Sequence, residues 1–136
     1  MILADTSAWI EFDRATGSAV DLRVRSLIET DGPLAVTEPV LMEVLAGARD
    51  RQREDRLRRL LTRFRWLAFD PVADFEGAAV VYRRCRAVGI TPRGLLDCMI
   101  VAVAWRRGAS LLSHDADMDR LASVIDLTLD GASLRT

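Results

Sequence analysis

The sequence predicts an α/β fold of three layers, with a parallel central sheet of about 4–5 strands and a protruding helical arm at about residues 49–66. Short apolar runs carry the expected strands, and segments with helical spacing separate them. A strand, a helical crossover and a second strand form a right-handed unit with parallel strands, so this alternation indicates a parallel sheet between helices. The 136 residues, 50% of them hydrophobic, are expected to form one domain over residues 1–136.

The composition limits where the protein works. The longest apolar run, Cys98–Trp105, is too short to span a bilayer, and the N-terminus lacks the basic segment of a signal peptide. Cys85 and Cys98 form neither a disulfide framework nor a metal knuckle, and we expect both to be buried free thiols. These features predict a cytoplasmic protein without membrane contact.

The first half of the chain alternates strands and helices. After the strand Met1–Ala4, a hydroxyl residue can cap a short helix, and later Thr37-Glu38-Pro39 combines a cap with a proline in the first turn. The helix over Val40–Ala46 is apolar on every side except Glu43, which predicts a buried helix. The expected elements are a helix capped by Thr6 or Ser7 and reaching about Phe12, a helix capped by Ser18 and ending before Asp31-Gly32-Pro33, the strand Leu34–Val36, and a helix ending at Gly47.

The second half continues the alternation. Its helices are expected at about Asp50–Arg65, at Asp74–Ala87 and from Thr91-Pro92 to Arg107, where Thr91-Pro92 repeats the pattern of a cap followed by proline. The remaining expected elements are strands at Trp66–Phe69 and Leu111–Ser113, a short helix from Asp115, and a final edge strand at Ile125–Leu129.

Four carboxylic acids stand in apolar surroundings: Asp5, Glu43, Asp97 and Asp115, with Asp117 close behind. Asp5 and Asp115 each follow a strand, and the carboxyl ends of parallel strands lie at one edge of the sheet. Two unit charges about 4 Å apart repel by roughly 4 kcal/mol at an effective dielectric constant near 20. Since the chain contains no lysine and only one histidine, a hard divalent cation with oxygen ligands is the economical counter-charge.

Two of these acids also have a structural explanation. Glu43 can pair with an arginine, and Asp97 lies near the start of a helix, where negative charge is favourable. A cluster of all four, however, suits Mg²⁺, which binds one or two carboxylates together with a substrate phosphate. Two such ions can activate a water and stabilise the leaving oxygen of a phosphodiester.

The order of these motifs resembles the PIN-domain ribonucleases. The matching segments are Asp5-Thr6-Ser7, a helix reading Glu-Val-Leu-Ala-Gly from Glu43, Leu-Leu-Asp97 before an alanine-rich helix, and Leu-Leu-Ser-His-Asp115-Ala-Asp117. The size and the arginine-rich arm resemble the VapC toxins of bacterial toxin–antitoxin pairs. The resemblance implies a PIN-like fold and cleavage of RNA by metal-activated water. It also implies Asp5, Glu43, Asp97 and Asp115 as metal-binding acids, Asp117 as an accessory acid, and one or two Mg²⁺ or Mn²⁺ ions, with Asp5 and Asp97 as principal ligands. A VapB-like antitoxin and a homodimer follow from the same resemblance.

Two further polar residues lie beside these acids in the sequence. Ser7 either orients a carboxylate, a water or a phosphate oxygen, or serves only as a helix cap. His114 is the only imidazole and so the only obvious neutral-pH base, but metal-activated water needs no such base.

The arginine-rich arm accounts for the charge asymmetry of the chain. Residues 49–65 contain eight arginines against three acids, a net charge of +5 in a chain of net charge −1. Arginine forms bidentate hydrogen bonds with phosphate groups, so these arginines suit RNA binding. Alternatively, intrahelical pairs such as Glu54–Arg58 and Asp55–Arg59 would make this an ordinary solvent-exposed helix face. The resemblance to VapC toxins implies a third use, in which an apolar stripe on the arm forms a groove for an antitoxin segment. The candidate contacts with RNA or antitoxin are Arg49, Arg53, Arg56, Leu57, Leu61, Phe64 and Arg93, with Trp66 at the end of the stripe.

Other functions fit the sequence less well. A calcium loop starting at Asp115 has Arg120 where that loop needs glycine, and a receiver domain needs a lysine that the chain lacks. A phosphatase with paired aspartates would need an acid at Ser7, and no glycine-rich phosphate loop is present. The main alternative is a catalytically silent PIN-like module that binds RNA or protein.

Overall fold

The computed structural model describes residues 1–136 as four strands and seven helices. In chain order the elements are β1 (Ile2–Ala4), α1 (Thr6–Asp13), α2 (Ala19–Glu29), β2 (Leu34–Val36), α3 (Glu38–Ala46), α4 (Arg51–Leu61), β3 (Arg65–Trp66), α5 (Pro71–Ala87), α6 (Leu95–Arg107), β4 (Ser110–Leu112) and α7 (Ala116–Val124). No helix combines the length and hydrophobicity that a membrane span requires.

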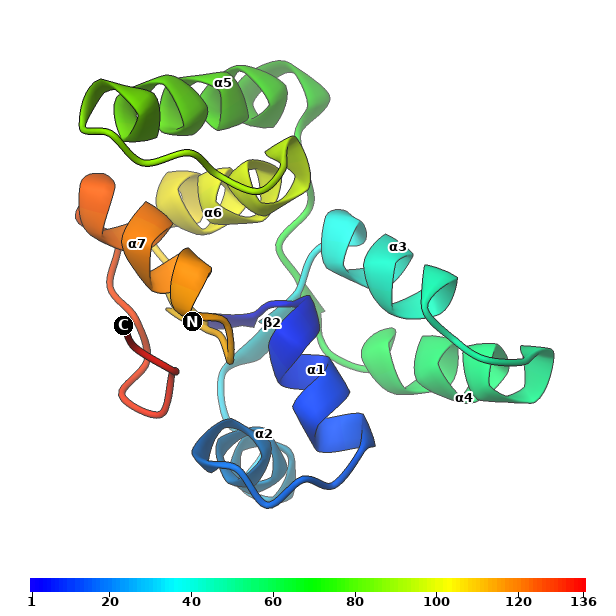
Figure 1. The fold of residues 1–136 in the computed structure, drawn as a ribbon. Helices are drawn as coiled ribbons and strands as arrows, with labels where there is room; N and C mark the ends of the chain where they lie inside the picture. Colours follow the sequence, from blue (N-terminus) through cyan, green and yellow to red (C-terminus); the bar gives the residue numbers. More distant parts are fainter.

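The four strands form one parallel sheet in the order β3-β2-β1-β4. Figure 1 shows α5 and α6 stacked on one side of this sheet and α1 and α2 on the other, which gives the predicted three layers. The helix α4, which lies within the arm expected at about residues 49–66, projects away from the sheet together with α3 (Figure 1). The three-layer fold with a parallel sheet is therefore confirmed.

The register of the central strands decides where the acids lie. Ala4 of β1 pairs with Leu112 of β4, and the backbone N–H of Asp5 donates to the Leu112 carbonyl over 3.0 Å. Both strands are buried because apolar helices cover both faces of a parallel sheet. The residues that follow β1 and β4 consequently emerge side by side at the carboxyl edge of the sheet.

Several predicted boundaries are wrong for local reasons. The cap of α1 is Asp5 itself, whose carboxylate accepts from the Ala8 N–H, rather than Thr6 or Ser7. The helix α5 begins at Pro71, because the Asp70 carboxylate caps it. The helix α6 begins only at Leu95 after an extended Gly94, so Thr91-Pro92 does not start a helix.

The arm and the C-terminal segment also differ from the prediction. The helix α4 ends at Leu61 instead of Arg65, and β3 is so short that it shares only Trp66 with the strand expected at Trp66–Phe69. Only one side of α3 is buried, through Pro39, Val40 and Val44, because α3 packs against α1, α4 and α6 while its remaining side faces solvent. The predicted strand at Ile125–Leu129 is reduced to a single bridge between Leu111 and Leu129, after a turn in which Asp126 has a positive φ.

The core is continuous around the sheet. Trp9, Leu3, Leu111 and Ile100 are among its fully buried side chains, and they come from both faces of the sheet and from the sheet itself. Cys85 and Cys98 are buried and free, as predicted, and burial raises the pKa of Cys98 to about 11. Both thiols therefore serve packing.

Candidate metal centre at the carboxyl edge of the sheet

The four candidate acids come from four different elements. Asp5 follows β1, Glu43 lies in α3, Asp97 lies in the first turn of α6, and Asp115 caps the start of α7 just beyond β4. The sheet register brings the first and last of these together, and α3 and α6 contact each other across the same region. The centre thus joins residues that are up to 110 positions apart in the chain.

Asp5 is the most buried of the acids, with 3% of its surface exposed. Its Oδ1 accepts a hydrogen bond from the Ser7 hydroxyl over 2.7 Å and another from the Ala8 N–H over 3.0 Å. Burial raises the pKa of Asp5 to about 6, against these hydrogen bonds, which lower it. A desolvated carboxylate of this kind gains more from a nearby cation than an exposed one does.

Serine hydroxyls from α1 and from the segment after β4 surround Asp5. The Ser7 hydroxyl accepts from the His114 N–H over 2.8 Å and lies 3.3 Å from the Ser113 hydroxyl. The Ser113 hydroxyl in turn accepts from the Asp115 N–H over 3.1 Å, and the Ser113 N–H donates to the Ser133 hydroxyl over 3.2 Å. These bonds tie the loop of Asp115 to the helix that follows Asp5. Ser7 thus acts on a carboxylate rather than as a helix cap.

Glu43 is held by a neighbour that sequence reasoning missed. The Thr6 hydroxyl donates to Oε1 of Glu43 over 2.6 Å, across 37 positions of sequence. No arginine pairs with Glu43, so the alternative prediction of a structural ion pair at this residue is wrong. The only sequence signal for this contact is a second hydroxyl residue directly after Asp5.

Arg93 lies among the remaining acids. Its Nη2 forms ion pairs with Asp115 and, over 3.5 Å, with Asp97, while its Nε lies 2.9 Å from Asp117. Asp117 also pairs with Arg120 over 2.6 Å. Arg93 was predicted as a contact for RNA or antitoxin. In the structure it reaches into the acidic centre.

The acids are close enough for their charges to act on one another. Burial, followed by the repulsion of Glu43 and Asp115, raises the pKa of Asp97 against the attraction of Arg93, and Asp115 also adds to the raised pKa of Asp5. This all-oxygen donor set fits a hard cation such as Mg²⁺. In the present arrangement, however, no group of three or more His, Cys, Asp and Glu side chains converges closely enough to enclose a metal ion. Thr6, Ser7 and Arg93 engage the carboxylate oxygens instead.

The contacts of His114 do not support a catalytic role for its imidazole. Its Nε2 lies 3.3 Å from a carboxylate oxygen of Glu11 in α1, and its backbone N–H donates to Ser7. The residue therefore contributes to the centre through its backbone.

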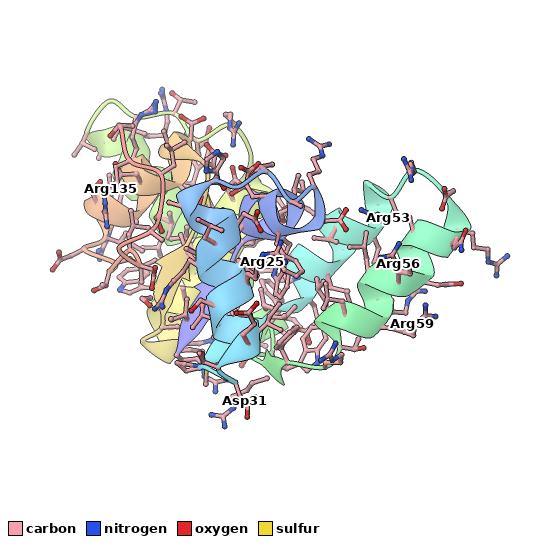
Figure 2. All side chains as sticks on the ribbon, turned by 90° about the horizontal axis from the view of Figure 1, so that it is seen from below. Arg25, Asp31, Arg53, Arg56, Arg59 and Arg135 are labelled. Carbon is pink, nitrogen blue, oxygen red and sulfur yellow. The ribbon has the colours of Figure 1, made fainter.

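The arm presents arginines from α4, as Figure 2 shows for Arg53, Arg56 and Arg59. Arg53 pairs with Asp13 over 2.7 Å, and Arg58 pairs with both Glu54 and Asp55, so the expected Asp55–Arg59 pair is not formed. Arg49 has no carboxylate partner beyond its neighbour Asp50 and is exposed. Several of the arm's arginines are thus available to a ligand.

The predicted apolar stripe of the arm is mostly part of the core. Leu61 is fully buried and Phe64 packs against Trp9 with ring centroids 5.4 Å apart. The helix α4 lies against α3, and its Arg53 pairs with Asp13 at the end of α1. These two residues therefore do not form a free groove. A cleft of about 290 Å³ lies instead between α1, α3 and α4, and its lining includes Leu57, Glu43, Arg14, Arg49 and Arg53.

Comparisons with known proteins define the class to which this fold and this centre belong. The sequence matches the PIN domain family over residues 2–124. Ribonuclease VapC11 of Mycobacterium tuberculosis is 43% identical over 128 residues, which cover 93% of this chain and 96% of the relative. The chain belongs to the PIN domain family and, within it, to the VapC ribonucleases.

Solved structures share the fold at low sequence identity. The VapBC2 complex of Rickettsia felis, bound to a promoter DNA fragment, matches with a TM-score of 0.77 at 16% identity, over 98% of this chain and 99% of that chain. VapC20 of M. tuberculosis, described as a sarcin–ricin loop cleaving toxin, matches with a TM-score of 0.69 at 18% identity, over 94% and 97% of the two chains. These structures confirm the predicted PIN-like fold, and the 43% identity to a VapC ribonuclease confirms the predicted family.

Proposed function

We propose that the acidic centre binds a divalent cation and that the protein uses it to cleave RNA as the toxin of a toxin–antitoxin pair. The observation that carries this proposal is that Asp5, Glu43, Asp97 and Asp115, from four elements, lie around the carboxyl edge of the sheet near enough for their charges to act on one another. That edge is where open α/β sheets bind ligands. The 43% identity to VapC ribonucleases supports RNA as the substrate.

The acids differ in the role that their surroundings suit. Asp5 and Asp97, the two whose pKa burial raises, are the principal ligands for Mg²⁺, or Mn²⁺ in its place, and Glu43 and Asp115 complete a site for one or two ions. Asp117 is accessory, because Arg120 holds one of its oxygens. A bound divalent cation supplies a Lewis acid that makes water a stronger nucleophile and stabilises negative charge on the phosphate.

Hydroxyl groups fix the orientation of two of these acids. Ser7 donates to Asp5, and Thr6 donates to Glu43, so neither carboxylate rotates freely. Such supporting hydrogen bonds keep ligand oxygens aimed at a metal and commonly change metal affinity or activity by roughly 10- to 100-fold.

The arm supplies positive charge for the substrate. Arg49, Arg53 and Arg56 lie on or beside α4, and the cleft that two of them line also contains Glu43 of the acidic centre. Phosphate contacts dominate the affinity of proteins for nucleic acids, so RNA that follows these arginines would be led toward the acids. Single-stranded or looped RNA suits an open cleft of this kind.

The proposed biological role is that of a toxin held in check by a VapB-like antitoxin. Structural neighbours include VapBC and FitAB assemblies, and the neighbour from R. felis contains toxin, antitoxin and DNA. We propose that this chain likewise forms a homodimer and a stable complex with its antitoxin in the cytoplasm. Expression of the chain alone should slow bacterial growth, and an Asp97→Asn variant should not. Equal growth with both would remove the support for a toxin role.

A cleavage assay tests the catalytic proposal. Purified protein should cut single-stranded and looped RNAs in Mg²⁺, and EDTA or Asp97→Asn should abolish the cleavage. Asp31→Asn is the matched control, because Asp31 is exposed in a turn with a positive φ, which asparagine tolerates, and lies outside the acidic centre. RNA degradation that survives both EDTA and Asp97→Asn would refute the metal mechanism. RNA binding without cleavage, across several RNAs and metals, would favour a silent binding module.

A further inference from the structure

Arg93 is the one cationic side chain that contacts several acids of the centre. Its guanidinium pairs with Asp97 and Asp115 through Nη2 and with Asp117 through Nε. The other arginine nearby, Arg120, reaches only Asp117. Two of the four acids proposed as metal ligands therefore have an oxygen directed at Arg93.

The backbone places Arg93 for this contact. It lies in the segment between α5 and α6, next to the extended Gly94 that precedes the first turn of α6. Its partners come from two other places, Asp97 in that first turn and Asp115 at the start of α7. Arg93 thus bridges two elements that must both contribute ligands to a metal.

The two halves of the centre are held in different ways. Neutral hydroxyls of Thr6 and Ser7 support Glu43 and Asp5, and they can remain in place when a cation binds. Asp97 and Asp115 are held by a positive charge, which repels a divalent cation and occupies one oxygen of each carboxylate. The Arg93 side chain is 60% exposed, so its guanidinium can move into solvent without unfolding its surroundings.

We propose that Arg93 is a displaceable internal counter-ion of the acidic centre, which competes with the divalent cation for Asp97 and Asp115. This inference rests on the proposed metal site and adds a control on its affinity. Arg93 stabilises the four acids against their mutual repulsion, and metal binding requires its guanidinium to leave them. The affinity of the site for metal is lower than its oxygen donors alone would give.

Metal titration by calorimetry tests this competition without using activity. Metal-free wild type, Arg93→Met and Arg93→Lys are titrated with Mn²⁺ and with Mg²⁺. Because Arg93→Met loses three partly exposed ion pairs, its dissociation constant for the metal should be about ten-fold lower than that of the wild type. The dissociation constant of Arg93→Lys should lie between the two. Without metal, Arg93→Met should melt at a lower temperature. Arg58→Met is the matched control, because Arg58 is 45% exposed and pairs with two acids of the arm.

A second measurement uses the unaltered protein. With ¹⁵N-labelled arginine, the Nε–H resonance of Arg93 should shift toward that of a free guanidinium as Mg²⁺ is added, with the same midpoint as metal binding. Metal binding that leaves this resonance unchanged would overturn the inference, even if the variants do not fold.

The possible outcomes separate the inference from the proposed function. Equal or weaker metal binding by Arg93→Met than by wild type would overturn the role of Arg93 and leave the metal centre intact. No metal binding by either protein would overturn both. Tighter binding by Arg93→Met but not by Arg58→Met supports the competition.

Discussion

Replacement of Asp5 by asparagine should abolish RNA cleavage and yet stabilise the metal-free fold at neutral pH. Asparagine keeps an oxygen that can accept from the Ser7 hydroxyl and the Ala8 N–H, the two donors to Asp5. It removes a carboxylate that is only 3% exposed. The variant therefore lacks the carboxylate that would bind the metal, and its folded state no longer carries the energetic cost of a buried charge.

The magnitude follows from the pKa of Asp5. Burial raises it from 3.8 to about 6, and each pKa unit corresponds to about 1.4 kcal/mol, so the ionised group costs the folded state about 3 kcal/mol. Since the folded state holds the proton more tightly than the unfolded chain, this cost is absent below pH 3.8. It grows between pH 3.8 and about 6 and stays constant above. For a chain of this length the gain corresponds to a melting temperature higher by about 10 °C.

Thermal unfolding in EDTA at pH 4 and pH 8 measures this effect. The melting temperatures of Asp5→Asn and wild type should be similar at pH 4 and clearly separated at pH 8. Asp31→Asn, which removes an exposed carboxylate, should follow the wild type at both pH values. An Asp5→Asn variant that melts at or below the wild-type temperature at pH 8 would refute the claim that Asp5 is destabilised by burial.

Two other substitutions probe different parts of the molecule. Thr6→Val should reduce the rate of RNA cleavage about ten-fold with little change in melting temperature, because it frees a partly buried Glu43 from its hydroxyl partner; an unchanged rate would show that this hydrogen bond does not orient the acid. Asp74→Asn, which breaks a pair between a residue 1% exposed and Arg106, whose side chain is 32% exposed, should destabilise the fold by about 2 kcal/mol at pH 7 in urea unfolding. Burial raises the pKa of Asp74, but the hydrogen bonds and charge of Arg106 outweigh it and lower that pKa below 3.8, so the difference from wild type should shrink as the pH falls below 3.8.

The meeting of Asp5 and Asp115 could be predicted because it depends only on local pattern and topology. Apolar runs mark β1 and β4, and parallel strands place their carboxyl ends at one edge. That Glu43 and Asp97 belong to the same centre was predicted from the order of acids along the chain, which resembles that of the PIN family. The structure then brings α3 and α6 together beside that edge.

The surroundings of the acids could not be predicted in the same way. Thr6 reaches Glu43 and Arg93 reaches Asp115 across 37 and 22 positions, and such side-chain contacts depend on tertiary packing. Thr91-Pro92 looked like a helix start, whereas the chain stays non-helical until Gly94, and this loop carries Arg93 to the centre. In the arm, the apolar pattern fits either an exposed groove or a face that packs into the core. The burial of Leu61 shows that it packs into the core.

The most direct test of a metal centre is to locate the cation. In crystals grown with Mn²⁺, anomalous scattering should place a metal peak within ligand distance of the Asp5 and Asp97 carboxylates, with Arg93 turned away from Asp115. The peak should be absent from Asp97→Asn crystals treated identically. A wild-type protein that cleaves RNA in Mn²⁺ but whose crystals show the peak away from these acids, or show none at saturating Mn²⁺, would contradict the proposed centre.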